Sequence, residues 1–128
     1  MTARLLLDTH ALIWVLSNPR RLPARVANSI RDPETDVYVS AASTWEIAIK
    51  AALRKIDANV TDVVRAMRAV SFDELPVTIA HTVRLGTLPN HHRDPFDRLL
   101  VAQAVEERLT IVTHDPLIAR YDVPRLWA

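Results

Sequence analysis

Short runs of hydrophobic residues alternate with longer amphipathic segments along this chain. Leu5–Leu7 is one such run, Val37–Val39 combines β-branched and aromatic residues, and Ile111–Thr113 is a third. Short apolar runs of this kind are typical of strands buried on both faces of a sheet. Because the segments between them have the spacing of helices, the pattern favours an α/β fold with a parallel sheet.

The helices are predicted over 9–16, from Leu22-Pro23 to about 31, over 40–53, from a cap at Thr61, over 78–85, over 95–109, and briefly after Asp115. Residues 72–76 are predicted to be a connector or a short strand. Gly86 is predicted to end the 78–85 helix in the left-handed conformation. Trp14 and Trp45 lie on apolar helical faces, which favours packing in the core over contact with a partner.

Length and composition exclude several classes of protein. The 128 residues suit one domain, so 1–128 is treated as one unit. The single glycine excludes a P-loop and a dinucleotide fingerprint, and the absence of cysteine excludes thiolate chemistry and Cys-ligated metals. No apolar stretch has the length of a membrane span, and Met1–Leu7 does not have the pattern of a signal peptide, so we expect a cytoplasmic protein. A net charge of +1 does not by itself indicate a nucleic-acid binder.

Acidic residues recur where predicted elements meet. Asp8 and Asp115 follow strands, and in a parallel sheet ligands bind beyond the carboxyl ends of the strands. Glu46 and Asp97 lie near helix N-termini that face the same edge in right-handed βαβ units. These four carboxylates are therefore predicted to converge.

Helix capping is the structural alternative for each acid taken alone. Ser43–Glu46 and Asp94–Asp97 have the spacing of a capping box, Asp115-Pro116 resembles a helix start, and Asp8 suits a cap for the helix that follows it. Taken together, clustered carboxylates repel one another and need a compensating cation. Oxygen ligands without cysteine favour Mg²⁺, with Mn²⁺ as a substitute, and point to metal-assisted phosphodiester hydrolysis.

Four segments together resemble the PIN domain, and more narrowly the VapC-type ribonuclease toxins: LLLDTHALIW, the Trp45-Glu46 segment, HRDPFDRLLVAQA and IVTHD. The resemblance covers residues 4 to about 127. It implies a Rossmann-like parallel sheet with helices on both sides. It also implies a Mg²⁺-dependent endoribonuclease that is inhibited by a cognate antitoxin and forms a homodimer.

The resemblance also implies roles for individual residues. Asp8 and Asp97 match the principal metal-binding acids, and Glu46 and Asp115 match the other two members of the quartet. Thr113 matches a hydroxyl position that orders the site. Asp94 is expected to cap a helix, or to contact the metal-binding residues without binding the metal itself.

The predicted reaction is hydrolysis of RNA by a metal-activated water, which leaves 5′-phosphate and 3′-hydroxyl ends. Basic residues at the rim are expected to contact RNA phosphates, the candidates being Arg20, Arg21, Arg93 and Arg98, with His91 and His92 in the loop before the long helix.

Three other functions remain open from the sequence. A metal-free ribonuclease would use a pair such as His10 and His114 as general acid and base. A phosphoacceptor receiver domain would need a second acid directly after Asp8, where the chain has Thr9. A non-catalytic PIN-like interaction module would use the acids only as helix caps.

Overall fold

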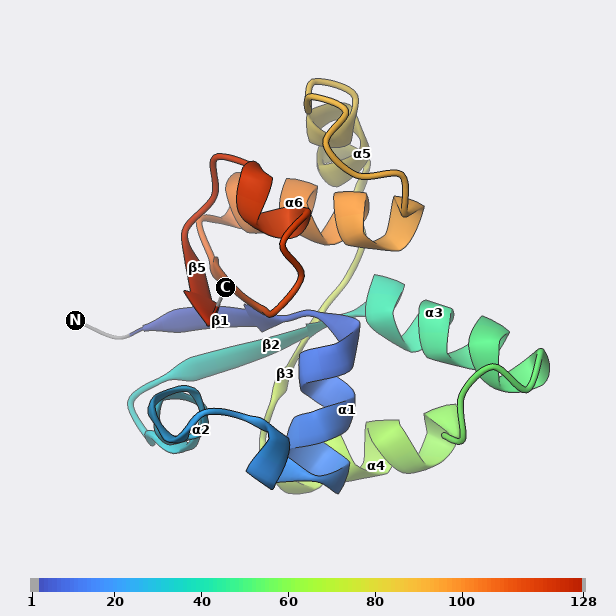
Figure 1. Ribbon diagram of the computed structural model, residues 1–128, viewed down its shortest axis with the longest axis vertical. Helices are drawn as coiled ribbons and strands as arrows, with labels where there is room; N and C mark the ends of the chain where they lie inside the picture. Colours follow the sequence, from blue (N-terminus) through green and yellow to red (C-terminus); the bar gives the residue numbers. More distant parts are fainter. Residues whose placement is uncertain (1–2, 128) are drawn as a thin grey trace.

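A five-stranded parallel sheet forms the centre of the protein in the computed structural model, which describes residues 3–127 (Figure 1). The strands are β1 (Arg4–Leu7), β2 (Asp36–Ser40), β3 (Asp73–Leu75), β4 (Thr110–Thr113) and β5 (Arg125–Trp127). Their spatial order is β3-β2-β1-β4-β5, and every neighbouring pair is parallel. The predicted α/β class and parallel sheet are therefore confirmed.

Helices cover both faces of this sheet (Figure 1). The helices are α1 (Thr9–Ser17), α2 (Ala24–Arg31), α3 (Ala41–Ala52), α4 (Val60–Ala69), α5 (Ile79–Leu85) and α6 (Pro95–Glu107), with 3₁₀ turns η1 (Pro19–Arg21) and η2 (Ile118–Arg120). In Figure 1, α1, α2 and α4 lie on one side of the sheet, and α5 and α6 lie on the other.

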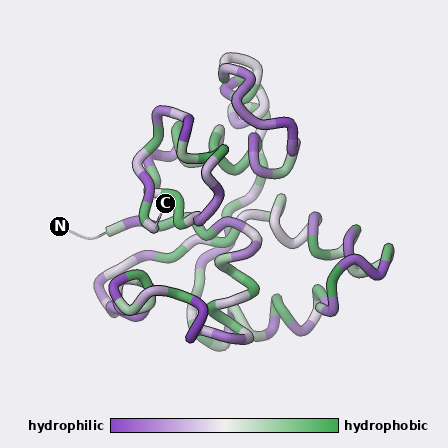
Figure 2. Tube along the Cα trace, in the orientation of Figure 1, coloured by the Kyte–Doolittle hydropathy of each residue, from purple (hydrophilic) through white to green (hydrophobic). Residues whose placement is uncertain are grey.

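The leucine run of β1 explains why both faces need cover. Leu5 and Leu7 pack into one hydrophobic cluster with α1 and α2, whereas Leu6 packs into a second cluster with α6. Successive side chains of a strand point to opposite faces, so three consecutive buried leucines fill two cores. Figure 2 shows the matching pattern, with hydrophobic residues concentrated in the middle of the sheet.

The order of the strands reverses at the carboxyl edge of the sheet, and the space beyond the ends of β1 and β4 is called the crevice below. From β1 the chain moves outward through β2 and β3, then returns to the other side of β1 with β4. The reversal therefore lies between β1 and β4, which is where open parallel sheets bind ligands. Asp8 follows β1 and Asp115 follows β4, so the topology alone brings these two acids to the same crevice.

Several local predictions were wrong. Asn59, not Thr61, caps α4, and Gly86 has an ordinary right-handed φ of −62° because the chain continues into further turns. The left-handed helix end is found instead at Arg108, after α6. Helix α3 begins at Ala41 with Ser40 as its cap, so Ser43 and Glu46 do not form a capping box.

Trp45 is the clearest error in the predicted core. Its side chain is 58% exposed, whereas Trp14 is half-buried and lies against Trp127. Ile49, one turn after Trp45 on the same face of α3, is exposed as well, so the apolar side chains of this helix are not buried along its whole length.

Strand β5 was not predicted. Its apolar residues are few and interrupted. The strand is defined by its backbone pairing with β4, which the local sequence does not reveal. Within residues 3–127, no helix has both the length and the apolar character needed to cross a membrane.

Candidate active site

Asp8 is held at the start of α1 by its own chain and by β4. It is 4% exposed, and its Oδ1 accepts a hydrogen bond from the backbone N–H of Ala11 at 2.8 Å, so it caps the helix. The Thr113 hydroxyl hydrogen-bonds to the Asp8 carboxylate and accepts the backbone N–H of Asp115 at 3.0 Å. Thr113 therefore ties the acid after β1 to the acid after β4.

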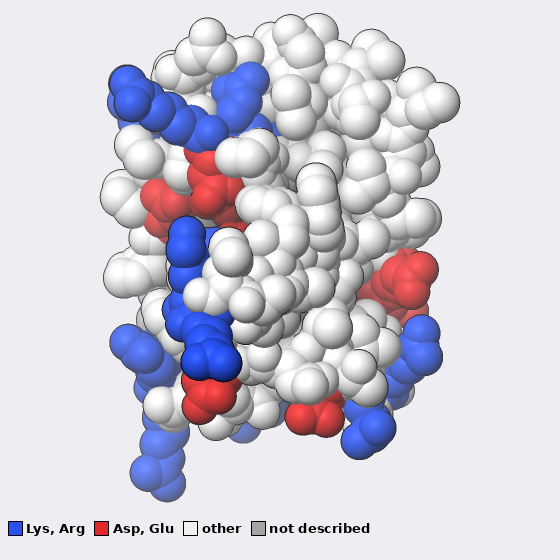
Figure 3. Space-filling view, turned by 90° about the vertical axis from the view of Figure 1, so that its right-hand side faces the viewer, with Lys and Arg blue, Asp and Glu red and all other residues white. Residues whose placement is uncertain are grey.

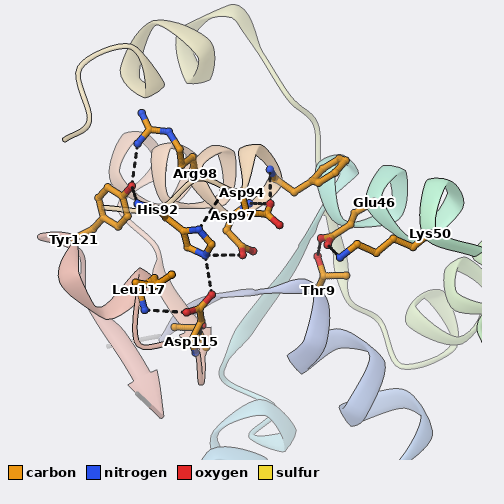
Figure 4. A network of polar contacts seen from close by, with 12 residues as sticks. Thr9, Glu46, Lys50, His92, Asp94, Asp97, Arg98, Asp115, Leu117 and Tyr121 are labelled. Carbon is orange, nitrogen blue, oxygen red and sulfur yellow. Dashed lines mark hydrogen bonds and ion pairs between the residues drawn. The ribbon is translucent and has the colours of Figure 1, made fainter. Parts of the chain in front are cut away.

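Asp94 and Asp97 divide two tasks at the start of α6. Oδ1 of Asp94 accepts the backbone N–H groups of Phe96 and Asp97, at 2.8 and 3.0 Å, which makes Asp94 the helix cap. Capping occupies Asp94, and the Asp97 side chain, one turn further on, points into the crevice (Figure 4).

His92 lies between the two acids that come from α6 and from the segment after β4 (Figure 4). Its Nε2 is 3.1 Å from Oδ2 of Asp97 and 2.8 Å from Oδ2 of Asp115. A second oxygen of Asp115, Oδ1, accepts the backbone N–H of Leu117 at 2.8 Å, as expected for a residue that begins a turn. These three side chains are close enough for their ligand atoms to share one metal ion.

Glu46 approaches the crevice from the middle of α3. The Thr9 hydroxyl donates to its Oε1 at 2.6 Å, and the Lys50 ammonium donates to its Oε2 at 2.5 Å (Figure 4). Glu46 is almost completely buried, whereas one third of the Lys50 side chain is exposed. A buried carboxylate paired with an ammonium and a hydroxyl satisfies the requirement that buried charges be compensated.

The pKa shifts indicate that the predicted quartet forms one electrostatic cluster. Burial, followed by the nearby carboxylates of Asp94, Asp8 and Glu46, raises the pKa of Asp97 to about 7. Burial also raises the pKa of Asp8, and the charge of Asp115 adds to that rise. Because like charges within a few ångströms disfavour ionisation, these shifts are those of carboxylates that share one crevice.

This cluster has the chemistry of a divalent-cation site. Figure 3 shows acidic residues grouped on the face that carries α3 and the start of α6, with basic residues above and below them. The converging ligand atoms are carboxylate oxygens, and a 2+ charge would offset the repulsion that raises the Asp97 pKa. The acids therefore fit a hard divalent cation.

The four arginine candidates occupy different surroundings. Arg98 donates to the carbonyl of Pro89 and to the Tyr121 hydroxyl, so its guanidinium holds the loop before α6. Arg93 is exposed in that loop. Arg20 and Arg21 lie beyond the far end of α1, about 13 Å along the helix axis from Asp8, and are not brought to the acids.

Both histidines of the metal-free alternative lie against aromatic rings. His10 contacts Trp14, His114 stacks on Trp127, and the two indoles contact each other. The histidine in the site is His92, which sequence reasoning placed at the rim. Lys50 was not assigned to the site from the sequence, although its position four residues after Glu46 predicts an ion pair on a helix.

Comparison with known proteins identifies the family and the fold. The family model of the PIN domain matches residues 5–124. A search of curated protein sequences found no match. Among solved structures, VapBC2 from Rickettsia felis bound to a promoter DNA fragment contains a chain that is 13% identical, with a TM-score of 0.71, over 96% of this chain and 97% of that one.

Two further structures have the same fold. VapBC-1 from nontypeable Haemophilus influenzae is 18% identical, with a TM-score of 0.68 and 96% of both chains covered. FitAcB from Neisseria gonorrhoeae is 24% identical, with a TM-score of 0.62, over 95% of this chain and 96% of that one.

Proposed function

Because the chain belongs to the PIN domain family, we propose that it is a Mg²⁺-dependent endoribonuclease and the toxin of a toxin–antitoxin pair. The observation that carries the proposal is the convergence of Asp8, Asp97 and Asp115 with Glu46 at the crevice between β1 and β4. A solved toxin–antitoxin complex from Klebsiella pneumoniae contains a chain of the same fold, which supports the biological setting.

Asp8, Asp97 and Asp115 would hold the cation, and Mn²⁺ is expected to replace Mg²⁺ because both prefer oxygen ligands. When bound, the cation lowers the pKa of a water and offsets negative charge on the scissile phosphate. Thr113 keeps Asp8 and Asp115 in register through its two hydrogen bonds.

Glu46 has a different task, because both of its oxygens already accept hydrogen bonds, from Thr9 and Lys50. With its orientation fixed in this way, Glu46 accepts a further hydrogen bond from the attacking water and aims it at phosphorus. Lys50 offsets the charge of Glu46 and adds positive charge next to the path of the RNA backbone.

Three of the arginine candidates contribute to RNA binding in this proposal. Arg93 is exposed in the loop next to the acids and contacts phosphates near the scissile bond. Arg20 and Arg21 are separated from the acids by α1, so any phosphate that they contact is distant from the scissile bond.

The proposed partners are a cognate antitoxin and a second copy of the chain, and the proposed location is the cytoplasm, where the RNA is. Exposed apolar side chains along α3 and at its C-terminal cap are available to an antitoxin: Trp45, Ile49 and Leu53. Sedimentation equilibrium of the purified protein tests the homodimer, which predicts twice the chain mass.

Cleavage of labelled single-stranded RNA with Mg²⁺ or with EDTA tests the activity. Asp8→Asn is the best control because asparagine caps helices as well as aspartate does, so the variant keeps α1 and loses only the charge. Cleavage that requires both Mg²⁺ and Asp8, with 5′-phosphate products, is expected. Products with 2′,3′-cyclic phosphates, or full activity of Asp8→Asn, would contradict the mechanism.

A further inference from the structure

The tautomer of the neutral His92 ring follows from its backbone surroundings. The N–H of Asp94 donates to Nδ1 of His92 at 3.1 Å, so Nδ1 carries a lone pair and not a proton. In a neutral imidazole the single proton is then on Nε2. That N–H points between Asp97 and Asp115 (Figure 4).

The same contacts argue against His92 as a metal ligand. Binding a cation through Nε2 requires a lone pair there, which moves the proton to Nδ1. Nδ1–H would then face the N–H of Asp94, and two donors would oppose each other at 3.1 Å. Asp94 has no freedom to turn away, because its side chain caps α6.

The loop that carries His92 is also held in place by Tyr121 and Arg98. The backbone N–H of His92 donates to the hydroxyl of Tyr121 at 3.1 Å, and Tyr121 is 3% exposed. Arg98 donates to that same hydroxyl at 3.0 Å and to the carbonyl of Pro89 at 2.9 Å. Arg98 and Tyr121 therefore fix the position of the imidazole relative to the acids.

The geometry points to His92 as a positioning residue that donates its Nε2–H to Asp97 and Asp115. This bond keeps both carboxylates in the orientation that binds the cation. The cation itself is bound by oxygen ligands alone. This inference rests on the proposed function for its metal and extends it to a residue outside the acidic quartet. Arg98 and Tyr121 act through His92, which gives Arg98 a role other than binding RNA. Outer hydrogen-bond partners of this kind tune metal sites strongly.

The first test reads the proton directly. Nitrogen-15 NMR of histidine-labelled protein at alkaline pH, with the His92 signals assigned by their loss in His92→Gln, is expected to show a protonated Nε2 and a bare Nδ1. Adding Mg²⁺ is expected to leave this tautomer unchanged. A proton on Nδ1, or a shift of Nε2 to the range of a metal-bound nitrogen when Zn²⁺ is added, would overturn the inference.

The second test compares Mg²⁺ affinity by titration calorimetry without RNA. We expect His92→Ala to weaken binding by about 10- to 100-fold, the range for lost outer hydrogen bonds at metal sites. His92→Gln is expected to restore most of the affinity, because a glutamine amide places an N–H near the position of Nε2, whereas His92→Asn is too short. His114→Gln, next to Asp115 but stacked on Trp127, is the matched control and is expected to bind like the wild type.

Equal losses in His92→Gln and His92→Ala would overturn the positioning role, as would a wild-type protein that binds no Mg²⁺. Tyr121→Phe, which removes only the hydroxyl, covers the case in which His92→Ala does not fold, and an intermediate loss of affinity is expected. An affinity of Tyr121→Phe equal to the wild type's would contradict the inference. Neither test uses RNA, so a protein that passes both but cleaves no RNA contradicts only the proposed function.

Discussion

The hydroxyl of Thr9 donates a hydrogen bond to Oε1 of Glu46 at 2.6 Å and so joins the first turn of α1 to the middle of α3. Both residues are at most 5% exposed, and the Ser43 hydroxyl lies 3.2 Å from that of Thr9. An acid from the second βα unit is thus oriented by the residue that directly follows Asp8.

Thr9→Val is expected to destabilise the protein by about 1–3 kcal/mol, the range for leaving a buried acceptor without its partner. Valine keeps the shape of threonine, so the change removes only the hydroxyl, with its bond to Glu46 and its contact with Ser43. Urea unfolding measures the effect. Thr82→Val, at an exposed position in α5, is the control and is expected to change stability much less. Equal effects of the two substitutions would show that the hydrogen bonds of the Thr9 hydroxyl contribute no stability.

Lys50→Met is expected to tighten Mg²⁺ binding severalfold while raising KM for RNA. Lys50 is paired with Glu46, and its pKa is raised mainly by that hydrogen bond, with added contributions from Asp94 and Asp97. Removing a positive charge from the acidic cluster strengthens the binding of a cation there and weakens the binding of the RNA phosphates. Calorimetry and steady-state kinetics measure the two effects, and Lys50→Arg is expected to resemble the wild type. Weaker Mg²⁺ binding in Lys50→Met would contradict this role.

Asp97 is expected to make the metal-free protein less stable as the pH rises from 4 to 7. Its pKa is raised from 3.8 to about 7 in the folded protein, first by burial and then by neighbouring carboxylates. In this range the unfolded chain has released the proton that the folded chain still binds, so the free energy of unfolding falls. Asp97→Asn removes this contribution, and its stability relative to the wild type is expected to increase with pH in urea unfolding series.

Mg²⁺ is expected to stabilise the wild type more at pH 7 than at pH 5, because the cation competes with the proton on Asp97. Thermal unfolding with and without Mg²⁺ measures this difference. A stabilisation by Mg²⁺ that is independent of pH, or that persists in Asp97→Asn, would show that Asp97 does not bind the metal.

Trp45→Ala is expected to change the free energy of unfolding by less than about 1 kcal/mol, whereas Leu100→Ala is expected to cost about 2–5 kcal/mol. Trp45 is 58% exposed and touches Phe96 edge-on, while Leu100 is completely buried in α6. Urea unfolding of both variants measures the contrast. A large decrease in the free energy of unfolding of Trp45→Ala would instead support the buried position predicted from the sequence.

Local pattern in the sequence was sufficient for the three central strands and for the acids that follow β1 and β4. Three leucines in succession can be buried only by cover on two faces, so Leu5–Leu7 predicts a central strand wherever it lies. Asp8 and Asp115 follow their strands directly, and parallel strands end at a common edge, so their proximity needs no knowledge of the side-chain packing.

Only the tertiary structure decided which neighbours complete the site. His92 and Tyr121 are 29 residues apart, and nothing local distinguishes His92 from His91 or assigns Arg98 to the loop instead of to RNA. Trp45 followed the same helical period as buried residues and is nevertheless exposed, because the sheet covers only part of α3. Hydrophobic period and capping act within a few residues of the chain, whereas the orientation of a loop or the cover of a helix depends on segments that meet only after folding.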